Sequence, residues 1–286
     1  MSNAKGLSII YLLAIGLTAL YINGCATAYI ARTTKVSKTA TGEEIYSKNI
    51  EIKTPPRKLP LGEKLTYEVR WLRIPVGTIV AFVYPDLEQV DGQSAYKVSV
   101  IAKTNDFCSK IYKVEDKFIS YIDTKTMTTL RHEVYRRDGR YKKDAITDFN
   151  QQNHMAHFKN LLDKSEKTFK IPENTQDTLS ACYYFRLLEL KLGDRIEYSV
   201  VNNEQNYRLF GIAEDKKFIK ISELGDFESF FIQPYAKEIG GEQVKKGKVS
   251  GYFSADERRL PLLAVVEAPM FTKVTATLTK IEYTGK

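Results

Sequence analysis

The stretch Leu65-Thr66-Tyr67-Glu68-Val69-Arg70-Trp71 decides the fold class. Its apolar side chains alternate strictly with polar ones, which is the period of a half-buried β-strand. The same pattern recurs as far as residues 273–283, and turn signals such as Asp91-Gly92 and Asp138-Gly139 separate the strands. Parallel pairs need long crossover connections, so these closely spaced strands predict a mainly β fold built on an antiparallel sheet.

One segment, residues 177–190, breaks this pattern and predicts a helix. Asp177 suits the N-cap position, and Gly193 is a stop signal. Residues at helical spacing from Leu179 to Leu190 share one face. We therefore expect an amphipathic helix packed across a curved antiparallel sheet or an incomplete β-barrel, because both have an apolar face that needs cover.

Residues 1–24 and Cys25 together have the form of a bacterial lipoprotein signal. Lys5 supplies a positive charge, residues 7–22 are almost entirely apolar, and the small Gly24 directly precedes the cysteine. We predict removal of residues 1–24 and attachment of lipid to Cys25, whose acyl chains, palmitate among them, would hold the protein to a membrane. A plain membrane anchor is the alternative, although a spanning helix needs about 20 apolar residues and this run is slightly short.

The rest of the chain divides into a tether and one domain. Residues 25–60, which begin with the lipidated cysteine, are rich in Thr, Lys, Ser and Glu, and such a composition cannot bury enough apolar surface to fold. A coil of this length spans roughly 30 Å. Residues 61–286 carry the strand pattern and predict a single β-rich domain. The expected location is the bacterial cell envelope, on a membrane and facing the periplasm, with the outer membrane favoured.

The formal charge of +8 is spread along the chain, and acidic residues stand beside most of the basic pairs. Solvated strand faces explain this distribution, and attraction to anionic headgroups or to a polyanionic envelope polymer is the alternative. Nucleic acid is not an expected partner in this compartment. The expected partners are a membrane, through lipid on Cys25, and either a lipid ligand or another envelope protein.

Sequence motifs of enzymes and metal sites are missing. The chain contains no Gly-rich phosphate loop, no G-x-S-x-G elbow and no H-E-x-x-H. His154 and His157 fall in a predicted strand, where residues three apart point to opposite faces, so they predict no metal site. We expect no catalytic residues, no enzyme activity and no cofactor. Cys108 and Cys182 are either a disulfide, which an oxidising periplasm permits, or two separate thiols.

Aromatic residues supply the candidates for a ligand pocket. Tyr183 and Tyr184 lie in the predicted helix, Trp71 ends the first strand, and Phe230 lies near a later strand. A curved sheet with a helix across its mouth often encloses a cavity, which makes these four candidate pocket residues. Ordinary packing in the sheet is the alternative, because aromatic residues favour strands.

Four stretches of the chain carry a family resemblance. They are Gly62-Glu63-Lys64-Leu65-Thr66-Tyr67-Glu68-Val69 with Trp71 and Pro75-Val76-Gly77, residues 113–123, Asp177-Thr178-Leu179-Ser180-Ala181-Cys182-Tyr183-Tyr184-Phe185-Arg186, and Ser254-Ala255-Asp256-Glu257-Arg258-Arg259-Leu260-Pro261. In order and spacing they resemble the bacterial domain-of-unknown-function family numbered 3108, over most of residues 61–283. The resemblance implies an exported, mostly β envelope protein with no assigned activity, similar in shape to the half-open barrels of lipoprotein carriers such as the LolA and LolB group.

The matched stretches also contain a candidate charge network. Arg186 on the predicted helix could pair with Asp256, and Arg258 or Arg259 could join them, since Arg forks bind carboxylates bidentately. We interpret these four residues as a structural clamp between helix and sheet. Binding of a ligand headgroup is the alternative.

The leading hypothesis is a lipid-anchored, non-enzymatic envelope protein that binds or passes an apolar ligand such as a lipid. A scaffold or adaptor that binds another envelope protein is the second hypothesis, and an exposed apolar patch would favour it. A hydrolase acting on envelope polymer is the third, but the sequence supplies no set of converging titratable groups for it.

Overall fold

The structure is a computed structural model, and it describes residues 57–247, 249–267 and 273–285. The predicted signal peptide, Cys25 and most of the predicted tether lie outside the described residues. Within the described part of the chain, no helix is both long and apolar enough to cross a membrane.

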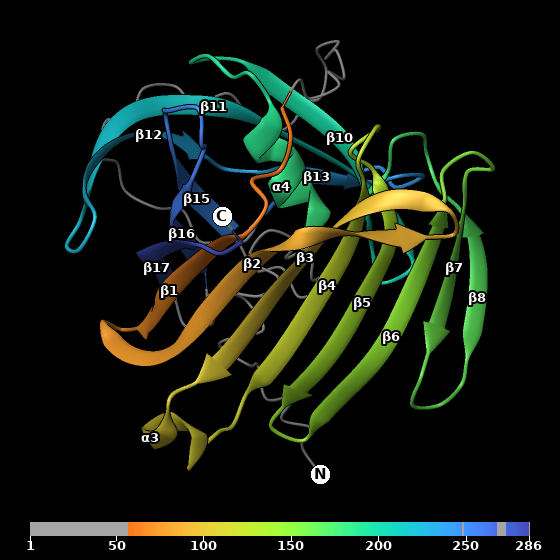
Figure 1. Cartoon of the computed structure of the whole chain (residues 1–286), viewed down its shortest axis with the longest axis horizontal. Coiled ribbons are helices and arrows are strands. Elements are labelled where there is room, and N and C mark those ends of the chain that lie inside the picture. Colours follow the sequence, from red (N-terminus) through yellow and green to blue (C-terminus); the bar gives the residue numbers. More distant parts are fainter. Residues whose placement is uncertain (1–56, 248, 268–272, 286) are drawn as a thin grey trace.

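The first half of the domain is an antiparallel meander in which each strand pairs with the next (Figure 1). Alternation in the sequence places every second side chain in the core, so Leu65, Tyr67 and Val69 are all buried. The strands are β1 (Glu63–Trp71), β2 (Ile74–Val90), β3 (Gln93–Thr104), β4 (Glu115–Asp123), β5 (Thr129–Asp138), β6 (Tyr141–Asn150), β7 (Met155–Asn160) and β8 (Glu166–Lys170).

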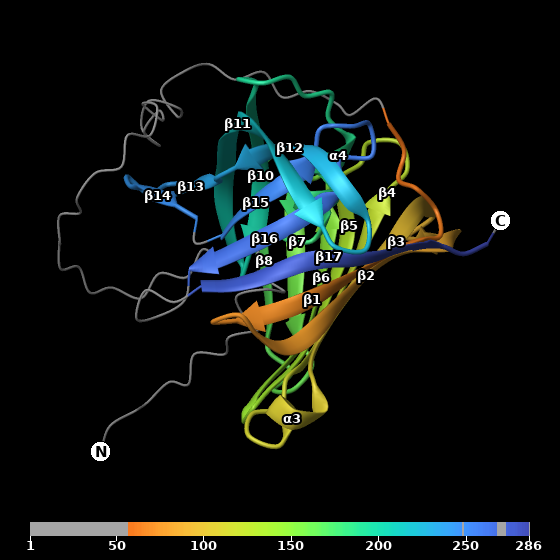
Figure 2. The same cartoon turned by 90° about the vertical axis from the view of Figure 1, so that its left-hand side faces the viewer.

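The second half wraps back over the first and encloses the helix α4 (Ser180–Leu187). Its strands are β9 (Gln176–Asp177), β10 (Arg195–Asn202), β11 (Gln205–Ile221), β12 (Gly225–Ile232), β13 (Tyr235–Glu238), β14 (Val244–Lys246), β15 (Val249–Ser254), β16 (Pro261–Glu267) and β17 (Lys273–Tyr283). Strand β17 pairs with β1, and the sheet continues from β17 through β16, β15, β12 and β11 to β10. Figure 2 shows this second half curving over the meander.

These pairings confirm the predicted fold class. The described strands form one large, curved, open sheet, and α4 packs against it. Antiparallel pairing holds throughout the described strands except for β9 and β10, which are parallel. Every described strand pairs with another described strand.

The connections of the meander alternate between two ends of the sheet, because consecutive strands run in opposite directions. Figures 1 and 2 show the short helix α3 (Asp106–Ser109) and α4 at opposite ends. The α3 rim consists of residues 72–73, 105–114, 139–140 and 161–165. The α4 rim consists of residues 91–92, 124–128 and 151–154.

The predicted helix is shorter and more buried than expected. All eight residues of α4 are buried, so the amphipathic helix predicted over 177–190 is a fully enclosed one. Asp177 belongs to β9, yet its carboxylate still accepts hydrogen bonds from the backbone N–H groups of Leu179 (2.6 Å) and Ser180 (3.0 Å). The helix can be buried on all sides because the sheet curves around it and supplies partners for its polar residues.

Two strand predictions also change. The start of the strand expected over residues 111–122 is part of the connection that contains α3, and β4 begins only at Glu115. The strands expected over 207–212 and 216–221 are one long strand, β11. Its first half pairs with β10 and β13, and its second half pairs with β12, so one strand serves both parts of the sheet.

Candidate apolar binding site

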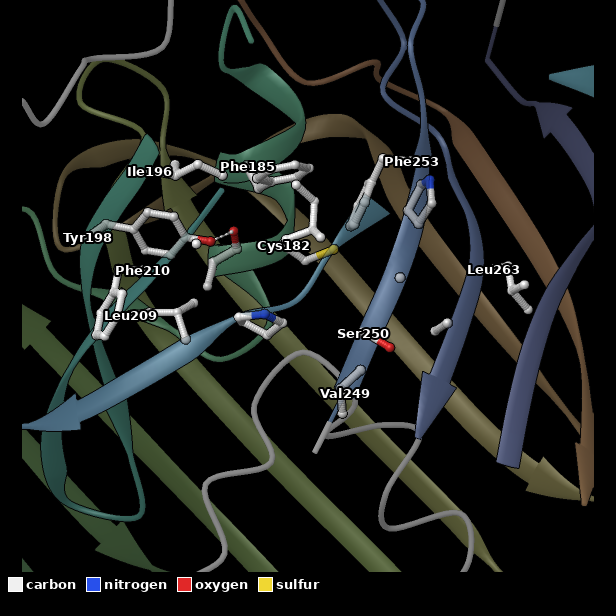
Figure 3. A pocket seen from close by; sticks show the side chains of 17 residues that line it. Cys182, Phe185, Ile196, Tyr198, Leu209, Phe210, Val249, Ser250, Phe253 and Leu263 are labelled. Atoms are coloured by element: carbon white, nitrogen blue, oxygen red, sulfur yellow. Dashed lines mark hydrogen bonds between the residues drawn. The ribbon is translucent and has the colours of Figure 1, made fainter. Parts of the chain in front are cut away.

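An apolar cavity of about 100 Å³ lies between α4 and the strands β10, β11, β15 and β16 (Figure 3). The helix contributes Ala181, Cys182 and Phe185 to its lining, and the sheet contributes mainly aliphatic and aromatic side chains. The hydroxyl of Tyr198, also in the lining, donates a hydrogen bond to the carbonyl of Ala181 (3.1 Å). With that hydroxyl satisfied, the cavity offers an occupant mostly carbon surface.

Glycine leaves part of this space open. Gly211 lines the cavity, and a Cβ atom at this position would lie 3.5 Å from its nearest neighbour, the carbonyl oxygen of Gln233. That distance is ordinary van der Waals contact, so the backbone tolerates a side chain here. A long side chain at Gly211 would therefore extend into the cavity.

The one thiol among the described lining residues is electrically neutral at physiological pH. Cys182 is buried, and burial raises the pKa of its thiol to about 12. A thiolate is the reactive form of cysteine, so this residue behaves as a small apolar group. Cys182 and Cys108 are both free, which answers the question of a disulfide between them.

The four predicted pocket residues do not gather around this cavity. None of them is among the described residues that line it. Tyr183, Tyr184 and Phe230 are buried in the core around α4, and Trp71 packs against a second core between β1 and β17. Helix geometry explains the difference, because the cavity side of α4 carries positions 181, 182 and 185, while Tyr183 and Tyr184 project elsewhere.

Arg186 does clamp α4 to the sheet, but its carboxylate partner is Glu63 rather than Asp256. The guanidinium donates two hydrogen bonds to the Glu63 carboxylate (2.7 and 2.9 Å) and one to the carbonyl of Arg258 (3.3 Å). Both side chains are buried. Burial alone would lower the pKa of Arg186, but the hydrogen bonds and charge of Glu63 outweigh it and raise that pKa.

The other members of the predicted network make contacts of their own. Asp256 pairs with the exposed Arg258 within one turn (2.6 Å). Arg259 donates to the carbonyls of Ala255 (3.0 Å) and Leu190 (2.8 Å), and so ties the end of the α4 segment to the β15–β16 turn. The structure therefore gives these residues structural contacts, and the backbone carbonyl of Arg258 links Arg186 to the Asp256–Arg258 pair.

A signal for Glu63 was present in the sequence. It shares the period-two face of Leu65, Tyr67 and Val69, all of which are buried. A carboxylate on an apolar face needs a cationic partner, since an unpaired buried charge is very costly. Glu63 lies two residues before Leu65, so the same alternation predicts that its carboxylate is buried and paired with a cation.

A buried hydroxyl, imidazole and carboxylate also meet beside α4, but not in the arrangement of a catalytic triad. Ser120 Oγ and Asp177 Oδ1 both lie near Nδ1 of His132 (3.1 and 3.2 Å). A triad requires the hydroxyl at one ring nitrogen and the carboxylate at the other. Ser120 and Asp177 are fully buried, and Thr129 also donates to Asp177 (2.9 Å). The group is a hydrogen-bonded anchor for the start of α4.

Metal-ligating residues do not cluster in the described part of the chain. No group of three or more His, Cys, Asp or Glu there is placed to hold a metal ion. His154 lies in the turn before β7, and His157 bonds to Thr168 in the neighbouring strand (2.8 Å).

Comparison with known proteins gives a family and a fold. The model of a family described as protein of unknown function DUF3108 matches residues 66–279. No curated protein matches the chain significantly. A beta-barrel-like protein of the domain of unknown function DUF1849 from Brucella abortus is similar in structure, with a TM-score of 0.52 and 7% sequence identity, over 79% of this chain and 99% of that chain.

A second solved structure is more distant. A Parabacteroides distasonis protein provisionally described as a lipoprotein has a TM-score of 0.30 and 7% identity, over 82% of this chain and 100% of that chain. At this level of similarity it adds nothing to the assignment. The Brucella protein supports the fold alone.

Proposed function

The chain belongs to the family of proteins of unknown function DUF3108, and on this premise we propose that it is a cell-envelope protein that binds an apolar ligand in the cavity beside α4. The ligand class that fits is an acyl chain or a similarly apolar part of a lipid. The role is binding rather than catalysis. In this proposal, lipid on Cys25 holds the domain to a membrane and the domain faces the periplasm.

The observation that carries the proposal is the chemistry of the cavity lining. Empty apolar cavities stay dry and accept apolar ligands, whereas polar cavities hold water. Here the described lining is mostly carbon, its tyrosine hydroxyl is occupied, and its thiol is neutral. An apolar ligand can therefore enter without breaking a hydrogen bond of the lining.

The size of the cavity limits what enters it. At about 100 Å³ it is smaller than the cavity of ~150 Å³ that holds one benzene molecule. The end of an acyl chain therefore fits better than a whole lipid, and the rest of the ligand stays outside.

Filling the cavity tests the proposal. Radiolabelled dodecanoate, whose chain is slimmer than an aromatic ring, is the probe: it should bind the chain from residue 25 onward with Cys25→Ser, and unlabelled dodecanoate should displace it. Gly211→Leu should weaken probe binding at least tenfold, because the new side chain occupies the space. Val249→Phe, on β15 and on the same strand face as Phe253, should have the same effect.

The matched control is Ile212→Leu, which introduces the same residue next along β11 at a position outside the lining. It should bind the probe like the unsubstituted chain, and thermal unfolding should show all variants to be folded. Undiminished binding by both filled variants, or no displaceable binding at all, would overturn the proposal.

A further inference from the structure

The two rims of the meander differ in their exposed side chains. Of the described residues, several large apolar ones at the α3 rim are largely exposed, up to 72% for Phe107 and 79% for Ile111. Among the described residues, the connections of the α4 rim have no exposed large apolar residue, and Met127 there is only 4% exposed. Beside these connections, Leu61 before β1 (43%) and Leu87 in β2 (48%) are exposed. The exposed apolar residues of the α3 rim and the strand positions beside it are Leu72, Ile74, Phe107, Ile111, Tyr112, Tyr141, Leu161 and Leu162.

Hydrogen bonds join three of the four connections of the α3 rim. The side-chain amide of Asn105 donates to the carbonyl of Pro75 (2.9 Å), which ties the α3 connection to the β1–β2 hairpin. On the other side, the hydroxyl of Tyr112 donates to the carboxylate of Asp138 (2.7 Å) at the β5–β6 turn. Figure 1 shows the connections that follow β3, β5 and β7 at the same end of the strands. With strands about 4.8 Å apart, the row is roughly 30 Å long.

Charge also separates the two rims. The α3 rim connections contain five basic and two acidic residues, namely Arg73, Lys110, Lys113, Arg140 and Lys164 against Asp106 and Asp163. One basic and one acidic residue, Lys125 and Asp91, stand in the connections of the α4 rim. Three acidic residues, Glu115, Asp138 and Glu166, flank these connections, and Glu115 pairs with Lys113 (3.7 Å). The exposed apolar side chains of the α3 rim are therefore interleaved with five basic residues in the connections themselves.

We propose that the α3 rim docks on the surface of an anionic lipid bilayer, with its apolar side chains inserted among the headgroups. Apolar residues interleaved with Lys and Arg are the composition of segments that bind in a membrane interface. Basic residues next to such a surface are attracted by anionic lipids. The basic residues of the connections are complementary in charge to that partner.

The shape of the rim favours a bilayer over a protein partner. Its apolar side chains project from separate turns along one row, whereas a stable protein interface usually buries a patch of about 800 Å² on each side. A bilayer accepts separate insertions, because lipids move apart around each one.

The length of chain before the domain permits this orientation. Leu59 lies in the same core as α4, so the described chain begins at the end remote from the α3 rim. Residues 25–56 number 32 and reach at most ~110 Å when extended. A domain of this size is roughly 45 Å across. An anchor at Cys25 would therefore leave the α3 rim free to meet the same membrane.

Vesicle sedimentation tests the proposal without the lipid anchor. The chain from residue 25 onward, with Cys25→Ser, should bind vesicles of phosphatidylethanolamine and phosphatidylglycerol, and bind pure phosphatidylcholine vesicles at least tenfold more weakly. The double variant Phe107→Ser/Ile111→Ser should lower binding to the anionic vesicles at least tenfold. Arg73→Glu/Lys110→Glu should do the same, and more at low salt.

The control is Phe218→Ser/Leu192→Ser, which removes two apolar residues of comparable exposure, 77% and 54%, away from this rim. It should bind like the unsubstituted chain. Gly211→Leu should also bind normally, so failure of the cavity proposal and failure of this one are distinguishable. Equal binding by the Phe107/Ile111 variant and its control would overturn the proposal. So would a dimer in sedimentation velocity that the same variant abolishes, since that result would identify a second copy as the partner.

Discussion

The two rims of the meander are built from the same strands, but their connections serve different purposes. At the α4 rim the connections are polar because they hold the segment that leads into α4. Gln151 donates to the carbonyls of Thr129 (2.7 Å) and Thr175 (2.9 Å), and Gln176 donates to the carbonyl of Met127 (2.9 Å). At the α3 rim the short helix α3 has no buried residue, and the turns present apolar side chains outward. Strand pairing therefore does not determine whether the connections carry polar or exposed apolar side chains.

The largest expected difference between the rims comes from two glutamates, each the first residue of a strand. Glu63 begins β1 at the α4 rim and binds the buried Arg186, whereas Glu115 begins β4 at the α3 rim and binds the exposed Lys103 (2.6 Å). Glu63→Gln should destabilise the fold by about 3–5 kcal/mol, because it leaves a buried charge without its counter-ion. Glu115→Gln should cost less than about 1 kcal/mol.

Urea denaturation at pH 7 measures both free energies of unfolding. Equal losses would show that the α4 rim is not the more tightly built end. A restored stability in the double variant Glu63→Gln/Arg186→Met, where no charge stays buried alone, would identify the lost ion pair as the cause.

Alkaline pH should distinguish the two ends next, since Cys182 lies in α4 and Cys108 lies in the α3 rim. Burial raises the pKa of the Cys182 thiol from 9.0 to about 12. A raised folded-state pKa means that the thiol's contribution to stability is complete below pH 9 and is lost as the pH rises towards 12. Each pH unit above 9 should therefore cost about 1.4 kcal/mol.

The measurement is urea denaturation at pH 8.5 and 10.5. The unsubstituted protein should lose about 2 kcal/mol more over this range than Cys182→Ala. Cys108→Ala, at the α3 rim, is the matched control and should keep the steeper dependence. Parallel curves for the unsubstituted protein and Cys182→Ala would contradict the burial of that thiol.

The smallest expected difference comes from the β6–β7 and β7–β8 turns. Gln151→Ala at the α4 rim should cost about 1–2 kcal/mol, because two backbone carbonyls lose their donor. Leu161→Ser/Leu162→Ser at the α3 rim should change stability by no more than about 0.5 kcal/mol, since both side chains are exposed. Thermal unfolding compares the two. A larger loss at the leucines would mean that they support the fold rather than a contact outside it.

Sequence reasoning predicted the sheet well because strand burial is a local property. The alternation in β1 specified its buried face, and Asp91-Gly92 marked a connection. The position of helix α4 in the sequence was predicted correctly, but its complete burial was not. Its eight residues became fully buried only because strands far away in the sequence, such as β10 and β15, fold over it.

The cavity was beyond the reach of the same reasoning. Its lining depends on which side of α4 faces the cavity, and Tyr183 and Tyr184 lie on other sides, while Trp71 and Phe230 belong to strands. Its space depends partly on the missing side chain of Gly211, which no local pattern indicates. The grouping of the α3 rim connections could have been predicted from the sequence, because the order of strands in an antiparallel meander determines which turns lie at the same end.

An open sheet has free edges, and this has a consequence for many copies crowded together. Strand β8 pairs with β7 and carries Glu166, Lys167 and Lys170 exposed along its five residues. Charged side chains on an edge strand oppose the addition of a strand from a neighbouring molecule. Neighbours of this protein can therefore lie close to one another without joining into a continuous β-structured aggregate.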